Sequence, residues 1–543
     1  MSASQDKKKR TQQRAEGTER RQVASQKAAQ EKKKSRIKWI VGSILVVLLI
    51  GFIIVGNSNL FYTAQKAVTI NGHSYSVAEF NYEYMSTYQR YNQMYTQYMG
   101  DASMCAPSAL YSEDDEDGDA FETWGDFYKD AAIQSLATKQ ALVDMAEADG
   151  VTLTEEEIKE IDDSLDELAS AAKEYGYGSA SKFLSANYGQ GVTLKLAREL
   201  MLRDALADKY QTQYQENLSF SDDELQAAYA EHKDEYDAYT FSYYLVQAET
   251  ETVTAEDGTE TAAEPTDEAM AAAKELADKL VSETKGDAER FAAVVADNCP
   301  AQEQTQMDDS GSVVTDEEGN PVTELKPAEP ARSEATQGST LVNYGMPFSD
   351  WVMEADRQPG DMTVVEQEGT GYYVVIFESR DDNSYSTVNV RHILIQAEDA
   401  DEDGAYSDEE LAAAKAEIEK VQAEYEAGAQ TEDAFAELAK QYSTDPGSKD
   451  NGGLYENVYR GQMVQEFNDW CYDETRQPGD VGIIEDAAYN GYHLMYFVGA
   501  GDSYQTVLAR NALSSEAMST FTDGLTADLQ VKELFAMRYA GVK

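Results

Sequence analysis

The spacing of apolar residues changes along this chain and predicts different elements in turn. Residues 39–56 (WIVGSILVVLLIGFIIVG) carry no charge, and as a helix they are long enough to cross a hydrocarbon layer of about 30 Å. Residues 67–76 (AVTINGHSYS) alternate about an Asn-Gly pair, which predicts a short β-hairpin. Ser76 then provides a helix cap, and the large side chains that follow recur at helical spacing: Phe80, Tyr84, Tyr88, Tyr91, Tyr95 and Tyr98.

Further helices are predicted up to residue 236 and again near the C-terminal end. Their ranges are 125–149, 154–175, 179–187, 193–215, 221–236 and 507–540. The aromatic and methionine side chains between Phe80 and Met99 have two interpretations. They form the buried face of a helix, or they form a groove for unfolded polypeptide, because large aromatic and thioether groups adapt to varied partners. The spacing favours the buried face, and the two interpretations can coexist.

Two β-like runs in the last third of the chain each contain a histidine. Residues 390–395 read VRHILI and include His392, and residues 490–494 read NGYHL and include His493. These are two of only four histidines in the chain. Between them lie a helical pattern and then four short motifs, which are STDPGS at 443–448, GGL at 452–454, GQM at 461–463, and Phe467.

The charge of the chain is divided unevenly. Residues 1–38 carry thirteen Lys and Arg against four Asp and Glu, whereas the rest carries 31 basic and 97 acidic side chains. This acidic body excludes nucleic acid as a partner, since binding phosphates requires Lys and Arg. The basic residues precede the apolar run, so the positive-inside rule places the N-terminus in the cytoplasm and the acidic body outside. A cleaved signal peptide is the alternative, but no small-residue cleavage site follows the run.

Neither the cysteines nor the acidic loops predict a metal site, and no cofactor is expected. Cys105, Cys299 and Cys471 are too few and too scattered for a disulfide framework or a zinc site. We expect buried or incidental thiols, with one bridge outside the cell as the alternative. A β-like run, not a helix, precedes the one acidic segment that fits a calcium loop, so we favour a solvated loop over calcium. That segment contains Asp399, Asp401, Asp403, Gly404 and Glu410.

The order of motifs from His392 to His493 resembles the parvulin family of peptidyl-prolyl isomerases. Each motif alone is common, but their combination over residues 388–500 is specific. The predicted helical block that precedes them resembles, in layout, the N-terminal chaperone region of extracytoplasmic foldases of the SurA and PrsA type. The resemblance implies an α+β protein of several domains: one transmembrane helix, an all-α SurA-like chaperone domain, and two tandem parvulin-like domains, each a four-stranded antiparallel sheet with helices.

The second parvulin-like domain is inferred from an internal repeat, because residues 240–384 follow the same pattern. The matching segments are 245–249 with 394–398, and 357–361 with 476–480. In this first copy Tyr243 stands at the position of His392, and Tyr373 stands at the position of His493. We therefore expect the first copy to be inactive.

The resemblance also assigns roles to residues of the second copy. Rotation about an X–Pro bond meets a barrier of about 18–20 kcal/mol from amide resonance, and a catalyst needs no nucleophile but must hold the proline, exclude water and favour the twisted amide. His392, Asp445 and His493 would be the catalytic group, with Asp445 at the position that is Cys or Asp across the family. The substrate would be bound by Leu454, Gln462, Met463 and Phe467, of which Leu454, Met463 and Phe467 form the proline cup.

Three departures from the family pattern predict a thinner polar network around the histidines. Ala488 stands where Thr is frequent, and Asn490 stands where Ser or Tyr is common. Leu454 follows Gly-Gly directly, without the usual Asp. We therefore expect a real but modest isomerase.

Together these patterns divide the chain into five parts. They are a disordered basic cytoplasmic tail at 1–37, a transmembrane helix at 38–57, a SurA-like helical chaperone domain at 62–236 with 503–543, a degenerate parvulin-like domain at 237–385, and a parvulin domain at 386–502. The predicted function is a peptidyl-prolyl isomerase and chaperone for unfolded or nascent secreted polypeptides with X–Pro bonds, anchored in the cell membrane by one helix with its bulk outside. The alternative is an inactive holdase that binds unfolded polypeptide through the same domains.

Overall fold

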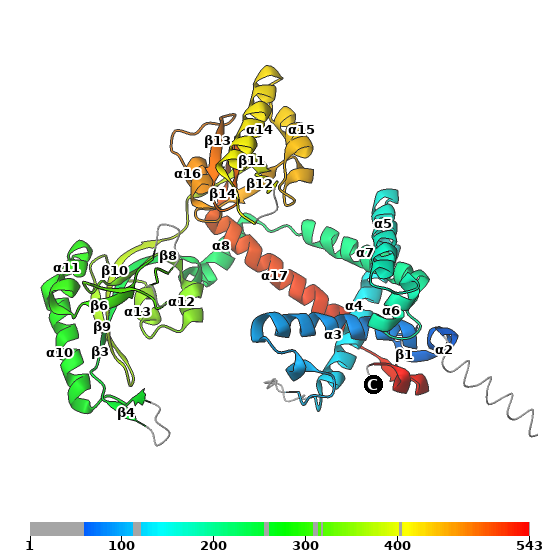
Figure 1. Ribbon diagram of the computed structural model, residues 1–543, viewed down its shortest axis with the longest axis horizontal. Coiled ribbons are helices and arrows are strands. Elements are labelled where there is room, and N and C mark those ends of the chain that lie inside the picture. Colours follow the sequence, from blue (N-terminus) through cyan, green and yellow to red (C-terminus); the bar gives the residue numbers. More distant parts are fainter. Residues whose placement is uncertain are drawn as a thin grey trace, which may run out of the picture. The chain divides into compact units, whose positions relative to one another are not determined.

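The computed structural model describes residues 59–111, 121–254, 260–307, 313–315, 319–400 and 404–541. The chain divides into two compact units, Met1–Leu218 with Glu516–Lys543, and Ser219–Ser515 (Figure 1). The finer domain boundaries expected from the sequence stay predictions. The predicted tail at residues 1–37 lies outside the described residues.

The transmembrane helix in the predicted fold class is corrected by the structure. Among the described residues, no helix is both long enough and apolar enough to cross a membrane. The long helices are amphipathic, as in α5 (Glu155–Glu174), where only Ile161, Leu165 and Ala172 are buried. The stretch at 38–57, to which the span was assigned, lies outside the described residues. The rest of the fold class, a mixed α+β architecture of several parts, agrees with the structure.

The first unit is mainly helical, and its helices follow the predicted ranges closely. Its elements are α2 (Asn59–Ala64), β1 (Lys66–Ile70), β2 (His73–Ser76), α3 (Val77–Met99), η1 (Ser103–Cys105), α4 (Trp124–Asp149), α5, α6 (Ala180–Tyr188), α7 (Leu194–Glu216), β15 (Val531–Glu533) and η3 (Phe535–Tyr539). The predicted hairpin is confirmed, since β1 pairs with β2 and the turn residues Asn71 and Gly72 both have positive φ. Ser76 caps α3 through a reciprocal bond pair with Glu79.

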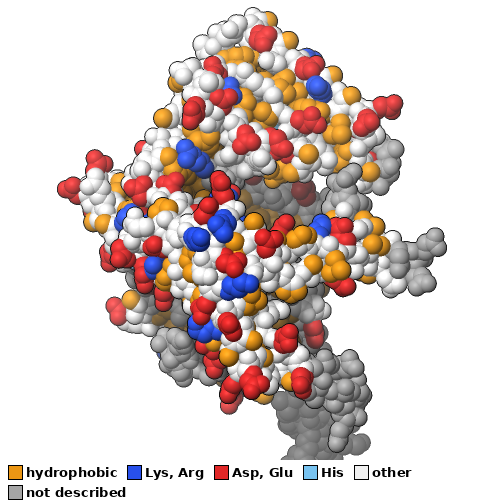
Figure 2. All heavy atoms as spheres, turned by 90° about the vertical axis from the view of Figure 1, so that its left-hand side faces the viewer, with side chains coloured by type: hydrophobic (Ala, Val, Ile, Leu, Met, Phe, Trp, Pro, Cys, Tyr) orange, Lys and Arg blue, Asp and Glu red, His pale blue; other side chains and the backbone are white. Residues whose placement is uncertain are grey.

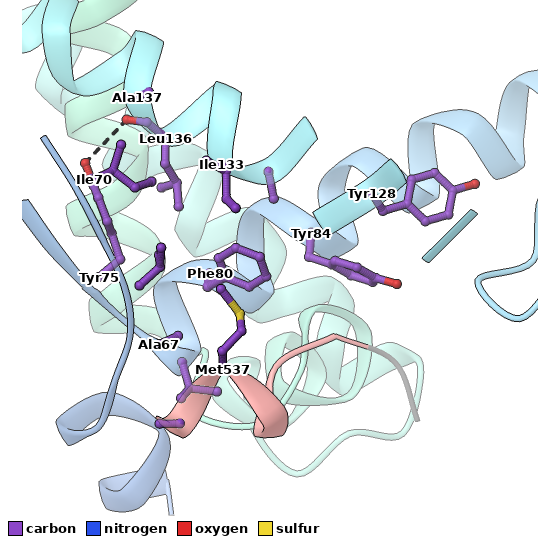
Figure 3. Packing of buried hydrophobic residues seen from close by; sticks show 14 of the residues in the cluster. Ala67, Ile70, Tyr75, Phe80, Tyr84, Tyr128, Ile133, Leu136, Ala137 and Met537 are labelled. Carbon is purple, nitrogen blue, oxygen red and sulfur yellow. Dashed lines mark hydrogen bonds between the residues drawn. The ribbon is translucent and has the colours of Figure 1, made fainter. Parts of the chain in front are cut away.

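Helix α3 is partly core and partly surface. Phe80 and Tyr84 are buried in the largest hydrophobic cluster of the unit, whereas Tyr98 and Met99 at the far end are exposed. Figure 3 shows Phe80 and Tyr84 packed with residues of β1, β2, α4 and η3, among them Met537. The Tyr75 hydroxyl donates a hydrogen bond to the Leu136 carbonyl in the same cluster. The aromatic stripe is therefore a core face for its first half.

The C-terminal end is the part of this unit that the pattern described incorrectly. A helix was predicted over residues 507–540, but α17 (Tyr504–Thr526) ends early. The strand β15 follows and pairs antiparallel with β1, with Thr69 opposite Lys532. This pairing gives the open edge of β1 its backbone partners. It also brings Met537 against the hydrophobic cluster, as expected for a C-terminal segment that packs on the N-terminal helices.

The second unit contains two four-stranded antiparallel sheets of the same strand pattern. The order is β8-β3-β10-β9 in the first and β12-β11-β14-β13 in the second. The part of the chain that contains the first sheet has the following elements: α8 (Asp222–Glu231), α9 (Lys233–Tyr236), β3 (Ala238–Gln247), β4 (Thr252–Thr254), β5 (Glu260–Ala262), α10 (Asp267–Thr284), α11 (Ala288–Asn298), β6 (Gln302–Thr305), β7 (Thr323–Lys326), β8 (Ala331–Gln337), α12 (Gly338–Tyr344), α13 (Ser349–Met353), β9 (Met362–Gln367) and β10 (Gly371–Asp381).

The second sheet carries the paired histidines on its two central strands. Its elements are β11 (Ser386–Gln396), α14 (Asp408–Ala427), α15 (Glu432–Tyr442), η2 (Lys449–Asn451), β12 (Leu454–Val458), α16 (Gln465–Cys471), β13 (Val481–Asp486) and β14 (Gly491–Ser503). One face packs against α14 and α15 through Ile393, Ile395 and Leu494. Alternation along the strands then turns His392 and His493 to the other face.

Candidate active site

The register between β11 and β14 brings the two histidines together. His392 lies opposite Met495, and Leu394 lies opposite His493, so the histidines occupy diagonal positions on one face of the sheet. Their Nδ1 atoms are 2.9 Å apart, and their rings are stacked with centroids 5.1 Å apart. Both are buried, with exposed fractions of 3% and 5%.

A carboxylate lies at each end of the histidine pair. Asp445 Oδ2 is 2.9 Å from His392 Nε2, and Asp486 Oδ2 is 2.9 Å from His493 Nε2. Ser448 Oγ also lies 3.0 Å from His392 Nε2. The structure thus brings the three predicted catalytic residues together and adds Asp486, giving one line of four groups: Asp445, His392, His493 and Asp486.

Backbone donors fix both carboxylates. The other oxygen of Asp445 accepts the N–H of Gly447, and the other oxygen of Asp486 accepts the N–H groups of Ala488 and Tyr489 in the β13–β14 turn. The hydrogen bond from His392 holds the pKa of Asp445 well below its usual range, against the opposing effect of burial. Asp445 is therefore ionised at neutral pH and acts as an acceptor.

The hydrogen-bond geometry constrains the tautomer of His392. An ionised carboxylate only accepts hydrogen bonds, so His392 Nε2 donates to Asp445. A hydrogen bond between the facing Nδ1 atoms requires a proton on one of them, because two bare nitrogens at this distance repel. These roles are assigned from the network.

The surroundings of His493 favour its neutral form. Burial, followed by the charge of His392, lowers its pKa, while the contact with Asp486 acts in the opposite direction. Asp486 orients the ring through its contact with Nε2.

Aromatic and apolar side chains adjoin the histidine pair. Phe467 on α16 is 2% exposed, and its ring lies edge-on, 5.6 Å from the ring of His392 and 5.7 Å from that of His493. Met463 and Tyr455 are partly buried against the same cluster. The Tyr455 hydroxyl donates to Asp445 across 3.2 Å, and burial raises the pKa of Tyr455. Phe467 is thus the buried member of this group, and Met463 and Tyr455 are its partly exposed members.

Two predicted substrate residues lie apart from this group of side chains. Leu454 pairs with Arg391, whereas Tyr455 pairs with Val390, so the side chain of Leu454 is on the opposite sheet face from His392. Gln462 is exposed, and its side-chain oxygen accepts the N–H of Tyr459 within its own turn. Met463 and Phe467 are the predicted substrate residues that the structure brings to the histidines.

Three residues of the site, Asp486, Ser448 and Tyr455, were not assigned a role from the sequence. Ala488 predicts a thinner polar network, but Asp486 supplies a buried carboxylate to His493 instead. The available signal was an acidic residue at the end of β13, followed by a turn that returns to the histidine strand.

The first copy keeps the ring arrangement without imidazoles. Tyr243 and Tyr373 have ring centroids 6.0 Å apart, and Phe348 lies 5.3 Å and 5.2 Å from them. This triad corresponds to His392, His493 and Phe467. β3 and β10 contain no histidine, so no imidazole pair can form here.

The remaining candidate residues are those of the acidic segment and the cysteines. Among the residues that the structure describes, no group of His, Cys, Asp and Glu is arranged to hold a metal ion. Glu410 caps its own helix by accepting the N–H of Ser407 and also accepts that of Ala400; Asp401 and Asp403 lie outside the described residues. The cysteines Cys105, Cys299 and Cys471 are free and buried.

Comparisons with known proteins confirm the family resemblance for two segments. Residues 372–498 match the family model described as the PPIC-type PPIASE domain, and residues 27–173 match the SurA-like N-terminal domain. The first match covers strands β11, β12 and β13 of the second sheet completely, together with most of β14. The chain therefore contains a parvulin-type isomerase domain together with a SurA-like domain.

Curated relatives carry the name foldase protein PrsA. The chain is 43% identical to PrsA 4 of Bacillus cereus over 11% of its own length and 21% of the relative. It is 30% identical to PrsA 1 of Listeria innocua over 25% of its own length and 40% of the relative. It is also 30% identical to PrsA of Geobacillus kaustophilus, over 32% of its own length and 53% of the relative. The chain thus spans about half, or less, of the length of these relatives.

Two solved structures are matched as well. The isomerase PrsA of Bacillus anthracis is 26% identical, with 26% of this chain and 58% of that chain covered and a TM-score of 0.17. The foldase PrsA of Streptococcus pneumoniae is 12% identical, with 77% of this chain and 91% of that chain covered and a TM-score of 0.18.

Proposed function

We propose that this protein is a peptidyl-prolyl cis–trans isomerase and chaperone that assists the folding of polypeptides outside the cytoplasm. The observation that carries the proposal is the buried pair of His392 and His493, against which the ring of Phe467 packs. A purely structural sheet has no need to bury two imidazoles between two carboxylates, because buried charges are costly.

The site favours the twisted amide by binding and desolvation. Phe467 and Met463 hold the proline ring, and the buried surroundings remove water from the carbonyl. Water stabilises the planar, resonance-polarised amide more than the twisted one, so its exclusion lowers the barrier. The carboxylates keep both imidazoles in fixed orientation, and their hydrogen bonds need no reorganisation while the bond rotates. Asp445 and Asp486 act only as hydrogen-bond acceptors, and neither acts as a nucleophile.

Holding unfolded polypeptide is the second function that we propose, and it is supported by the first unit. A hollow of about 670 Å³ there is lined in part by Phe80, Tyr84 and Met537. Phe535 on its rim is 71% exposed. Charged side chains also line the hollow, namely Asp126, Lys129, Glu533 and Arg538. The exposed ring of Phe535 suits a chaperone, since exposed hydrophobic side chains bind the apolar segments of unfolded chains.

The clients that we propose are secreted polypeptides, with a preference for basic ones. Figure 2 shows Asp and Glu side chains scattered between hydrophobic ones over the face drawn, and the chain as a whole has a formal net charge of −57. Such a field attracts cationic segments and repels nucleic acid. The resemblance to extracytoplasmic foldases supports the location.

The test is the rate of X–Pro isomerisation in a short proline peptide, measured by NMR exchange with and without the full chain. Uncatalysed exchange takes tens of seconds, and we expect the full chain to shorten this time. In parallel, aggregation of a chemically denatured protein is followed by light scattering. Suppressed aggregation together with an uncatalysed exchange rate would leave only the holdase.

A further inference from the structure

Strand β3 of the first copy has a hydrogen-bonded neighbour strand along only part of one of its two edges. Its pairing with β10 continues to Gln247, opposite Gly371. Its pairing with β8 ends at Tyr243, opposite Ala331. Among the described residues, 244–247 therefore form an open sheet edge, which is a template for another strand.

The peptide groups of Leu245 and Gln247 face this open side. The N–H of Ala248 donates to Thr370 across 2.9 Å, and hydrogen bonding alternates along an antiparallel strand. Val246 and Tyr244 therefore face β10, and the residues between them face away from it. In the described part of the chain, the N–H groups of Leu245 and Gln247 have no acceptor.

The second copy shows what covers the corresponding edge. Leu394 corresponds to Leu245 in the repeat, and its N–H donates to Ser443 Oγ across 3.2 Å. Its carbonyl accepts the N–H of Thr444 at 2.8 Å and the hydroxyl of Thr444 at 3.0 Å. The cover in that copy is thus a segment of the chain itself, Ser443 and Thr444, which bonds to the edge through two hydroxyls and one backbone N–H.

A groove of about 400 Å³ runs along the open edge of the first copy. Tyr243 lines it on one face of the sheet, and Tyr244 and Leu276 line it on the other. Glu329 is its charged lining residue. An added strand would present alternate side chains to the two faces, both of which are aromatic or apolar.

We propose that residues 244–247 of β3 bind an extended segment of unfolded polypeptide as an added strand. The backbone groups of Leu245 and Gln247 supply the affinity, and the groove selects apolar side chains followed by a basic one near Glu329. The inference rests on the proposed function insofar as the segment belongs to a client. It gives the first copy a binding role that needs no histidine.

The first test follows amide exchange in the full chain. The probe is a short peptide of alternating valine and threonine with lysine at both ends and no proline. We expect the amides of Leu245 and Gln247 to exchange fast in the free protein and to become protected by the peptide. The amide of Leu394, already bonded to Ser443, should not change. Unchanged exchange at Leu245 and Gln247 with saturating peptide would overturn the proposal.

The second test uses a matched pair of proline variants. Gln247→Pro removes an N–H that faces the open edge and leaves the bonds to β10 intact, whereas Glu249→Pro makes the same change beyond the end of β3. Fluorescence anisotropy of the labelled peptide should show roughly three- to tenfold weaker binding for Gln247→Pro, the effect of one hydrogen bond. Equal affinity of the two variants would refute the added strand. Because the probe lacks proline, the result stands apart from the isomerase assay, which neither variant should affect.

Discussion

His493 Nε2 lies 2.9 Å from Asp486 Oδ2, seven residues earlier in the chain and across a β-hairpin turn. The carboxylate is 1% exposed, and the turn that follows it, through the N–H groups of Ala488 and Tyr489, holds its second oxygen. This contact gives the second histidine an anchor of its own, matching the one that Asp445 gives to His392.

Replacing this anchor should weaken both the fold and the reaction. Asp486→Asn removes the charge that accepts from His493 Nε2, so the ring loses its fixed orientation. We expect isomerase activity to fall roughly 10- to 100-fold and unfolding free energy to fall by about 1.5–3 kcal/mol, the range for a hydrogen bond to a charged group. Peptide isomerisation and urea unfolding measure the two effects. Glu485→Gln, at the exposed neighbour, is the control and should change neither.

The buried His493 should make the protein less stable as the pH falls. Its folded pKa is lowered by burial and by His392, so below about pH 6.5 the unfolded chain takes up a proton that the folded chain does not. Stability therefore rises with pH through this window and is lost towards acid. Urea unfolding between neutral and mildly acidic pH should show a shallower dependence for His493→Gln than for the parent chain. An identical pH dependence of the two would count against the neutral, buried imidazole.

Met463 should act on substrate binding more than on turnover. Met463→Ala shortens a partly buried apolar side chain that, in the proposed mechanism, contacts the proline in the ground state and in the twisted state alike. We expect KM to rise several-fold, for a loss of roughly 1 kcal/mol, and kcat to stay nearly constant. Met346→Ala, which shortens a methionine packed on the first copy, is the control. A fall in kcat at constant KM would contradict this role.

The second glycine of the Gly-Gly pair should be irreplaceable. Gly453 has φ +74°, and a Cβ there would lie 2.1 Å from the carbonyl oxygen of His392. Gly453→Ala should lower the unfolding free energy by more than about 1 kcal/mol and should reduce activity, because the collision moves β11 at the histidine. Gly461→Ala separates the two causes: its φ is +79°, but nothing lies within 4 Å. Equal losses in the two variants would show that backbone strain alone matters.

The sequence was sufficient for those features that depend on alternation and repetition. His392 and His493 each lie in a period-two strand pattern, which turns them to one face, and the repeat predicted a first sheet with Tyr243 and Tyr373 in their places. Both follow from local rules that do not depend on distant contacts.

Features that depend on register and on turns could not be obtained in this way. Leu454 lies on the sheet face opposite to His392 because the pairing of β12 with β11 shifts by one residue between Val388 and Val390. The sequence pattern does not indicate this shift. Asp486 reaches His493 only through the conformation of the turn after β13. The strand β15 was predicted as helix because its role is to pair with β1, more than four hundred residues earlier.

The most direct measurement is the isomerisation rate of a proline peptide with His392→Ala compared with His73→Ala, each in the full chain and each confirmed as folded by circular dichroism. His73 is an exposed histidine of the first unit, so its replacement should leave the rate unchanged. We predict that His392→Ala loses most of the catalysed rate while binding of unfolded polypeptide persists. Equal rates for the two variants would contradict the account and would show that the histidine pair takes no part in the reaction.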